Sequence, residues 1–196
     1  MNIKYLKSQK GKVIKGPLIL EPKIFKDNRG FFLESWNKKI FNKAINTNIE
    51  FVQDNHSKSS KGVLRGLHYQ LPNKSQCKLI RCTRGKIFDV VVDVRKSSDT
   101  FCDWSYCELS NTNKQQLWIP EGFAHGFLVL SDFAEVQYKT DNYWSKENER
   151  SIKWDDKNIN IAWPLSKIGL KEPILGEKDL TAPSLEQAKI QKDLFY

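Results

Sequence analysis

Three histidines are the side chains of this 196-residue chain best suited to move protons near neutral pH: His56, His68 and His125. Each has distinctive neighbours, in the runs DNHS (54–57), RGLHY (65–69) and PEGFAHG (120–126). A glycine close to His68 and another beside His125 indicate that something approaches the backbone closely there. The alternative for each histidine is a structural role, in which its ring nitrogens form hydrogen bonds within the protein core.

Arg65 and His68 lie three residues apart, so a regular strand would point their side chains to opposite faces. A bulge at Gly66 would turn both toward one cavity, whereas a plain strand break there would give them no shared function. Lys78 would then add a second cation to the same cavity. Tyr138, in the run EVQYK, is typical of a packed strand tyrosine with a solvated hydroxyl.

A metal site is not expected from these residues. Metal-binding double-sheet barrels typically offer a His-x-His pair with a nearby Glu and a further His, and the chain has no His-x-His. Its four cysteines, at positions 77, 82, 102 and 107, include no CxxC pair. Both close pairs are five residues apart, which places the two thiols on opposite faces of a strand. We therefore expect reduced, partly buried thiols.

Strands dominate the elements that must position these side chains, from about residue 17 to residue 164. Strand patterns occur at residues 18–20, 30–34, 51–53, 62–70, 77–82, 86–95, 104–109, 116–119, 126–130 and 134–140. Such a series predicts an all-β closed barrel or double-sheet jelly roll. A short helix is predicted at 35–45, and Ser184 with Gln187 predicts a capping box that opens a final helix of about ten residues. We expect one domain over 1–196, with its core at about 17–164 and a C-terminal extension with a helix at 165–196.

The strand at 86–95 alternates between two kinds of face. Phe88, Val90, Val92 and Val94 share one face. The other face carries Ile87, Asp89, Val91, Asp93 and Arg95. If the valine face packs between two sheets, the Asp89 face lines either solvent or a polar barrel interior. A barrel with a polar interior would hold a ligand pocket.

The composition excludes several classes of protein. No apolar run approaches the roughly 20 residues of a membrane-spanning helix, and residues 1–15 lack the pattern of a secretory signal, so we expect a cytoplasmic protein. The net charge is +9, from 32 basic and 23 acidic residues, and residues 1–48 carry most of it. This segment is either a solvated lysine surface or a surface that attracts an anionic ligand. No nucleic-acid-binding motif accompanies it.

Several long motifs together resemble one family. The runs FVQDNHS (51–57), GVLRGLHYQ (62–70) and QLWIPEGFAHGF (116–127) resemble those of the dTDP-4-dehydrorhamnose 3,5-epimerases, and DNRGFF (27–32) and WP (163–164) are similar too. The resemblance covers roughly residues 17–183 in the family's order. It implies a cupin-type double-stranded β-helix, or jelly-roll barrel, with a few short peripheral helices. It also implies a homodimer without metal or other cofactor, and neither a nucleic-acid nor a membrane partner.

The implied reaction inverts C3 and C5 of dTDP-4-dehydro-6-deoxy-D-glucose. Both carbons lie alpha to the C4 ketone, so the site needs a base, a proton donor on the opposite face and positive charge at the carbonyl oxygen. By resemblance, His68 is the base, Tyr138 the proton donor and Lys78 the group that holds the enolate oxygen. Asp179 matches the acid that orients His68, and Asp89 is a second candidate for that role.

The substrate-binding residues also follow from the resemblance. They are Arg29, Phe32, Glu34, Gln53, Asn55, Arg65, Asp89, His125 and Glu149. In some members of the family, the residues around Arg29 reach across to the partner subunit's site. Trp144 stands where a tyrosine is common, and Cys102 stands where a glycine is usual; neither touches the expected chemistry.

Three alternatives stay open at this point. Related enzymes epimerise only C3 or only C5 and share most of this residue set. A non-catalytic cupin that binds a nucleotide sugar would lack His68, Asp179 or Tyr138, and all three are present. A nucleic-acid-binding protein that uses the basic N-terminal segment would show a salt-sensitive affinity and no turnover of sugar nucleotides.

Overall fold

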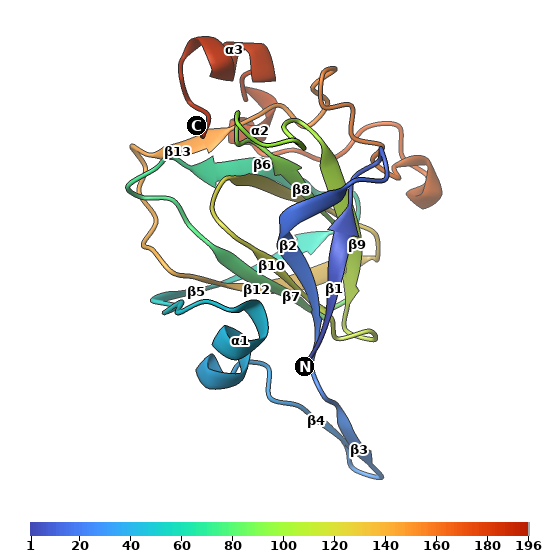
Figure 1. The fold of residues 1–196 in the computed structure, drawn as a ribbon. Helices are drawn as coiled ribbons and strands as arrows, with labels where there is room; N and C mark the ends of the chain where they lie inside the picture. The colour runs from blue at the N-terminus through green and yellow to red at the C-terminus, as the bar shows by residue number, and fades with distance from the viewer. Residues whose placement is uncertain (196) are drawn as a thin grey trace.

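The computed structural model describes residues 1–195, in which two antiparallel sheets face each other (Figure 1). The six-stranded sheet contains, in spatial order, β1 (Asn2–Lys7), β2 (Val13–Glu21), β10 (Gln116–Ile119), β7 (Lys78–Arg84), β12 (Phe133–Thr140) and β5 (Gln53–Ser60). The five-stranded sheet contains β13 (Glu149–Ser151), β6 (Leu64–Gln70), β11 (Phe123–Val129), β8 (Lys86–Asp93) and β9 (Trp104–Ser110). The predicted all-β double-sheet architecture is confirmed.

Helices are few and short, as the sequence predicts: α1 (Lys38–Ile45), the 3-10 turn η1 (Ser166–Ile168), α2 (Glu177–Leu180) and α3 (Leu185–Ile190). The helix predicted at 35–45 begins only at Lys38, because the Asn37 side chain accepts a hydrogen bond from the Ile40 N–H and caps it. The predicted capping box of Ser184 and Gln187 opens α3, which runs for six residues rather than about ten. No helix among residues 1–195 is long and apolar enough to cross a membrane.

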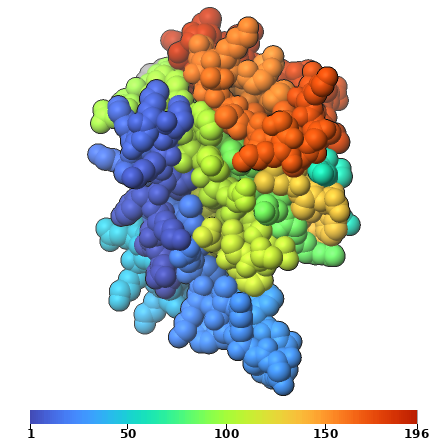
Figure 2. Space-filling view, turned by 90° about the vertical axis from the view of Figure 1, so that its right-hand side faces the viewer, coloured from blue at the N-terminus to red at the C-terminus, as the bar shows by residue number. Residues whose placement is uncertain are grey.

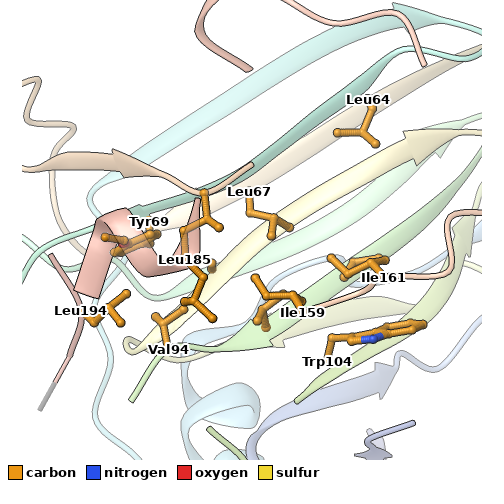
Figure 3. Close-up of a cluster of buried hydrophobic side chains, with 14 of the residues drawn as sticks. Leu64, Leu67, Tyr69, Val94, Trp104, Ile159, Ile161, Leu185 and Leu194 are labelled. Carbon is orange, nitrogen blue, oxygen red and sulfur yellow. The ribbon is translucent and has the colours of Figure 1, made fainter. Parts of the chain in front are cut away.

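Three hydrophobic clusters hold the layers together. The inter-sheet core joins both sheets, for example through Ile80 and Leu117 on one and Val91 and Leu109 on the other. The helix-side core packs α1 on the outer face of the six-stranded sheet through Phe41 and Trp118, whose ring centroids lie 5.2 Å apart. The C-terminal core covers the outer face of the five-stranded sheet with residues from 152 to 195. Figure 3 shows part of it: Leu64, Leu67, Tyr69, Val94 and Trp104 against Ile159, Ile161, Leu185 and Leu194.

The C-terminal core determines which face of β8 looks into the barrel. Phe88 and Val90 pack in the C-terminal core, whereas Ile87 and Val91 pack in the inter-sheet core. The premise that the valine face lies between the sheets is therefore wrong, because the C-terminal segment buries that face from outside. The face that carries Asp89 looks into the barrel, which makes the barrel interior partly polar.

A two-stranded hairpin stands apart from the barrel. It consists of β3 (Phe25–Asp27) and β4 (Gly30–Phe32), joined by the predicted turn. Figures 1 and 2 show it protruding from the lower end of the molecule. Phe25, Phe31 and Phe32 are all exposed on it, so the hairpin presents apolar surface that this single chain does not cover.

Candidate active site

A bulge in β6 brings Arg65 and His68 to one face of the five-stranded sheet. On the neighbouring strand β11, His125 pairs with His68 and Phe127 pairs with Arg65, so three residue steps on β6 match two on β11. Directly paired residues share a face of the sheet. Since Phe127 belongs to the inter-sheet core, Arg65 and His68 point between the sheets. The predicted bulge is confirmed.

Gly66 makes this bulge sterically feasible. Its φ is 130°, in a region that favours glycine, and a Cβ at this position would lie 2.5 Å from the Cα of Gly126 on β11. The two glycines that the sequence places beside the histidines therefore allow two backbones to approach each other, rather than a backbone to approach a ligand.

His68 forms a dyad with Asp179, which α2 supplies. His68 Nε2 lies 2.5 Å from Asp179 Oδ1. Burial lowers the pKa of His68. The hydrogen bond that His68 donates to Asp179 opposes that shift, while the charges of Lys178 and Lys78 add to it. A neutral imidazole with one nitrogen held by a carboxylate has its other nitrogen free to accept a proton.

A second dyad lies beside the first. His125 Nε2 lies 2.7 Å from Asp89 Oδ1, and Asp89 is fully buried. Asp89 Oδ2 has no hydrogen-bond partner among residues 1–195. Of the two candidate partners for His68, the structure thus places Asp179 on His68 and Asp89 on His125.

Lys78 reaches the dyads from the opposite sheet. It shares one face of β7 with Ile80 and Cys82, which belong to the inter-sheet core, so it points between the sheets. Its Nζ donates to the His68 carbonyl oxygen at 3.4 Å. Burial, with the charge of Lys178 as the next cause, lowers the pKa of Lys78 to about 8. A buried cation therefore lies between the two walls of the barrel.

Tyr138 lies on the wall opposite His68. It pairs with Ile80 of β7 and packs against the inter-sheet core, so its ring also points between the sheets. Burial raises the pKa of Tyr138, the charge of Glu149 adds to this, and Arg65 opposes it. The phenol therefore keeps its proton at neutral pH.

Polar side chains follow Tyr138 toward one edge of the barrel. Asn55 pairs with Tyr138, and Gln53 donates from Nε2 to Asn55 Oδ1 at 2.9 Å. Across the gap, Glu149 Oε1 on β13 lies 2.5 Å from Lys178 Nζ. Nine of the predicted site residues thus share this space: His68, Tyr138, Asp179, Lys78, Gln53, Asn55, Arg65, His125 and Asp89, with Glu149 at its edge.

The other three predicted binding residues are not there. Arg29 and Glu34 make their contacts locally, with Asp27 at 2.6 Å and with Asn37 at 3.2 Å, and Phe32 is 66% exposed. All lie on or next to the protruding hairpin (Figure 1). Within this one chain, they are remote from the dyads.

His56 is also outside this space. Its Nε2 lies 3.2 Å from Glu135 Oε2, in the row of β5 and β12 residues that alternates with Asn55 and Tyr138. It lines a hollow of about 330 Å³ on the outer face of the six-stranded sheet, together with Arg81 and Lys139. Of the three histidines, only His68 and His125 face the barrel interior.

The described residues offer no metal centre. In residues 1–195, no group of three or more His, Cys, Asp and Glu side chains is arranged to hold a metal ion. All four cysteines are free thiols. Cys77 packs in the helix-side core and Cys82 in the inter-sheet core, so the opposite-face prediction for this pair is confirmed.

Comparison with known proteins identifies the family. A sequence profile described as dTDP-4-dehydrorhamnose 3,5-epimerase matches residues 12–187. The chain belongs to the dTDP-4-dehydrorhamnose 3,5-epimerase family. It is 58% identical over 171 residues to the dTDP-4-dehydrorhamnose 3,5-epimerase of Shigella flexneri, which covers 87% of this chain and 92% of that protein.

Solved structures agree with this membership. A Legionella pneumophila epimerase in complex with dTDP-4-keto-L-rhamnose is 42% identical, has a TM-score of 0.89 and covers 99% of this chain and 98% of its own. A 3'-monoepimerase from Streptomyces bikiniensis in complex with dTDP-quinovose is 32% identical, has a TM-score of 0.86 and covers 92% and 89%. The predictions of a cupin-type jelly roll and of an isomerase of this family are confirmed.

Two departures from the family pattern have a structural setting in this epimerase. Cys102 has a φ of 65°, in the left-handed region, which explains why glycine is usual there. Trp144 lies at the edge of the barrel, where its backbone N–H donates to Gln53 Oε1 at 3.2 Å. Its position next to a predicted binding residue was not anticipated from the sequence.

Sequence reasoning missed two further residues at the site. Lys178 pairs with Glu149, and Ser59 accepts a hydrogen bond from Arg65 Nε at 3.0 Å. Lys178 precedes Asp179 directly, and that adjacency was the available signal. Ser59 carries no signal of its own, because it lies in a strand whose alternation is entirely polar.

Proposed function

We propose that the chain inverts C3 and C5 of dTDP-4-dehydro-6-deoxy-D-glucose and releases dTDP-4-dehydro-L-rhamnose. The observation that carries this proposal is the placement of His68 on one sheet and Tyr138 on the other, with both facing the interior and Asp179 of α2 bonded to His68. Inversion by deprotonation needs a base on one face of the sugar and an acid on the other. The ligand of the Legionella relative supports a dTDP-ketosugar as substrate.

In this proposal His68 removes the proton. Its ring nitrogen that is not bonded to Asp179 accepts the proton from C3 or C5. The C–H electron pair then forms a C=C bond to C4, and the π electrons of the C4 carbonyl move onto its oxygen to give the enolate. The Asp179 carboxylate then stabilises the imidazolium. The lowered pKa of His68 keeps the imidazole neutral before substrate arrives, as a base requires.

Lys78 stabilises the enolate in this proposal, and His125 contacts the sugar. Lys78 is buried between the sheets, and its ammonium would face the charge that develops on the C4 oxygen. A cation in a buried site stabilises such a charge far more than a solvated one does. The Asp89 carboxylate accepts from Nε2 of His125 at 2.7 Å, which leaves the other nitrogen of that ring to accept a hydrogen bond from a sugar hydroxyl.

Tyr138 completes the inversion by donating its proton to the carbon from the opposite face. The electron pair of the enolate returns to the carbon and the ketone reforms. The phenolate regains a proton from solvent, and the His68 imidazolium releases its proton to solvent. Because Tyr138 is protonated at neutral pH and lies on the opposite wall from His68, it fits this role. The same two steps then act on the second carbon.

The nucleotide part of the substrate would lie toward Gln53, Asn55, Arg65 and Glu149 at the barrel edge. We further propose a homodimer in which Arg29, Phe32 and Glu34 serve the site of the second copy. Two observations support this: the hairpin protrudes, and its phenylalanines are exposed. We also propose a cytoplasmic location, since four free thiols fit a reducing compartment.

Proton NMR of the enzyme with dTDP-4-dehydro-6-deoxyglucose in heavy water tests the function. We expect the signals of H3 and H5 both to disappear and the L-sugar to form. Loss of one signal only would instead assign the chain to single epimerisation, as the name of the Streptomyces relative describes for that protein. No exchange at either carbon would overturn the proposal.

Two variants connect the activity to the site. His68→Ala should abolish exchange at both carbons, because it removes the base of this proposal. His56→Ala is the matched control, since His56 lies on the outer face of the six-stranded sheet and should leave exchange intact. Full exchange in His68→Ala would show that another residue is the base.

A further inference from the structure

Asp193 joins two strands of the five-stranded sheet on the outer face of that sheet. Its Oδ1 lies 2.8 Å from Arg150 Nε on β13, and its backbone carbonyl oxygen accepts a hydrogen bond from the Tyr69 hydroxyl of β6 at 2.8 Å. Arg150 and Tyr69 are directly paired across β13 and β6. Asp193 lies outside residues 12–187, which match the family profile. One residue beyond the profile therefore holds both members of this cross-strand pair.

These two contacts are largely shielded from solvent. Tyr69 is 4% exposed, and the side chains of Arg150 and Asp193 are 29% and 16% exposed. Burial raises the pKa of Tyr69 and the charge of Asp193 adds to this, so the phenol keeps its proton and remains a donor. An ion pair in such surroundings is weakened less by water and salt than a pair on the open surface. The two contacts therefore restrain the strands more than surface contacts would.

The segment that carries Asp193 is itself well anchored. The Asp193 N–H donates to the Ala188 carbonyl oxygen of α3 at 2.9 Å, and Leu194 is buried in the C-terminal core (Figure 3). The Phe195 N–H donates to the carbonyl oxygen of Val94, directly after β8, at 3.2 Å. Asp193 thus connects β13 and β6 to a fixed part of the molecule.

β13 is the strand that such a restraint affects most. It has three residues and lies at the edge of its sheet, so it has a neighbouring strand on one side only. Short elements at an edge open locally at a small cost in free energy, because few contacts hold them. β6, in contrast, lies between β13 and β11.

Glu149 projects from the inner face of β13. Side chains alternate along a strand, so Arg150 points outward and Glu149 points toward the barrel interior. Glu149 pairs with Gln70 of β6, and its Oε1 lies 2.5 Å from Lys178 Nζ. A movement of β13 relative to β6 would therefore displace this carboxylate at the edge of the site.

We propose that Asp193 is a positioning residue for Glu149: by holding Arg150 and Tyr69 on the outer face, it fixes β13 against β6 and so fixes the carboxylate on the inner face. The inference rests on the proposed function, in which Glu149 serves substrate binding, and deepens it by naming the residue that keeps Glu149 in place.

The first test compares Asp193→Ala with the wild-type enzyme. The variant removes the partner of Arg150, so we expect KM for dTDP-4-dehydro-6-deoxyglucose to rise about threefold to tenfold, the effect of weakening one hydrogen bond to the substrate. kcat should fall by a smaller factor, because His68 lies on β6, which β11 holds from its other side. Glu186→Gln is the matched control: it removes a nearby but more exposed ion pair, with Lys189 at 2.7 Å on α3, and should leave KM unchanged.

Amide hydrogen exchange, followed by NMR, tests the restraint on β13 directly. The Ile152 N–H donates to the Leu67 carbonyl oxygen at 3.0 Å, immediately after β13. Its exchange should become at least about threefold faster in Asp193→Ala and stay unchanged in Glu186→Gln. This measurement needs no substrate. It therefore distinguishes failure of this inference from failure of the proposed function, in which the wild-type enzyme would exchange neither H3 nor H5.

Two further variants test whether the effect passes through the named groups. Tyr69→Phe removes only the hydroxyl and keeps the buried ring, so KM should rise in the same direction but by less than in Asp193→Ala. In a Glu149→Gln background, adding Asp193→Ala should change KM little further, because the carboxylate to be positioned is already gone. An unchanged KM in both Asp193→Ala and Tyr69→Phe would overturn the inference, as would effects of Asp193→Ala and Glu149→Gln that multiply in full.

Discussion

The Asp179→Asn substitution removes the negative charge that holds His68 and keeps the size of the side chain. Both groups are largely buried, with side chains 26% and 8% exposed, and their atoms lie 2.5 Å apart. A hydrogen bond between charged groups contributes about 1.5–3 kcal/mol. At 1.36 kcal/mol per tenfold change in rate, loss of this bond from the transition state should lower the plateau of kcat about 10- to 150-fold.

The same variant should also shift the pH dependence of kcat, and the shift favours activity at low pH although the maximal rate falls. Asp179 favours the protonated form of His68 and raises its pKa against the stronger effect of burial. In the asparagine variant that support is gone, so the pKa of His68 falls further. The neutral base then persists to lower pH, and the acid limb of the kcat profile should move to lower pH while the plateau drops.

Initial rates of product formation, measured by NMR across the pH range, check both expectations. Glu177→Gln is the control, since it removes one carboxylate from the exposed part of the same helix. A thermal unfolding curve for each variant establishes that the fold is retained. A plateau that falls less than about threefold, or an acid limb that moves to higher pH, would refute the role given to Asp179.

Three further predictions follow from the geometry of the site. Tyr138→Phe should retain deuterium exchange while product formation falls on the order of 100-fold, because His68 can still remove and return a proton on one face; NMR resolves both, and equal losses would argue against a donor role. Activity should decline as the pH rises through about 8, where Lys78 loses its proton, and Lys78→Arg should move that decline to higher pH, which a rate–pH profile measures. Gly66→Ala should cost about 1–3 kcal/mol or more in the free energy of unfolding, read from urea denaturation, because its methyl group would meet the backbone of Gly126; an unchanged midpoint would contradict this steric argument.

The bulge and the placement of Cys77 and Cys82 on opposite faces could be predicted from the sequence, because both depend only on the alternation of side chains along one strand. Side chains alternate along a strand, so Arg65 and His68 can share a face only if the strand is irregular between them, and Gly66 permits the irregularity. The same rule separates Cys77 from Cys82. Neither prediction requires knowledge of what covers the sheet.

The orientation of β8 could not be predicted, since it depends on a distant segment. Alternation shows which residues share a face but not which face looks inward. Both faces of β8 are buried, one of them by residues beyond Ile152, and no residue within the strand indicates that contact.

Residues 54–60 of β5 were also not predicted as a strand. Its residues are polar on both faces because one face lines the site and the strand is at the edge of its sheet.

The dyad shows the limit of sequence reasoning about the site. His68 and Asp179 are 111 residues apart, and spacing alone gives no reason to pair them rather than His68 and Asp89. The family resemblance provides both candidates, and the structure assigns one carboxylate to each histidine. Arg29, Phe32 and Glu34 are the opposite case, since the resemblance assigns them to a site that they do not reach within a single chain.

Asp179 lies between Ile161 and Leu185, both of which pack in the C-terminal core. Closing the outer face of the five-stranded sheet and delivering the carboxylate to His68 are therefore one event in the assembly of the molecule. A ribosome must release most of this chain before that event can occur, even though every strand of the barrel has been made by residue 151. A nascent chain can thus form its sheets early, but it acquires its proton-transfer centre only after the segment that carries Asp179 has been made.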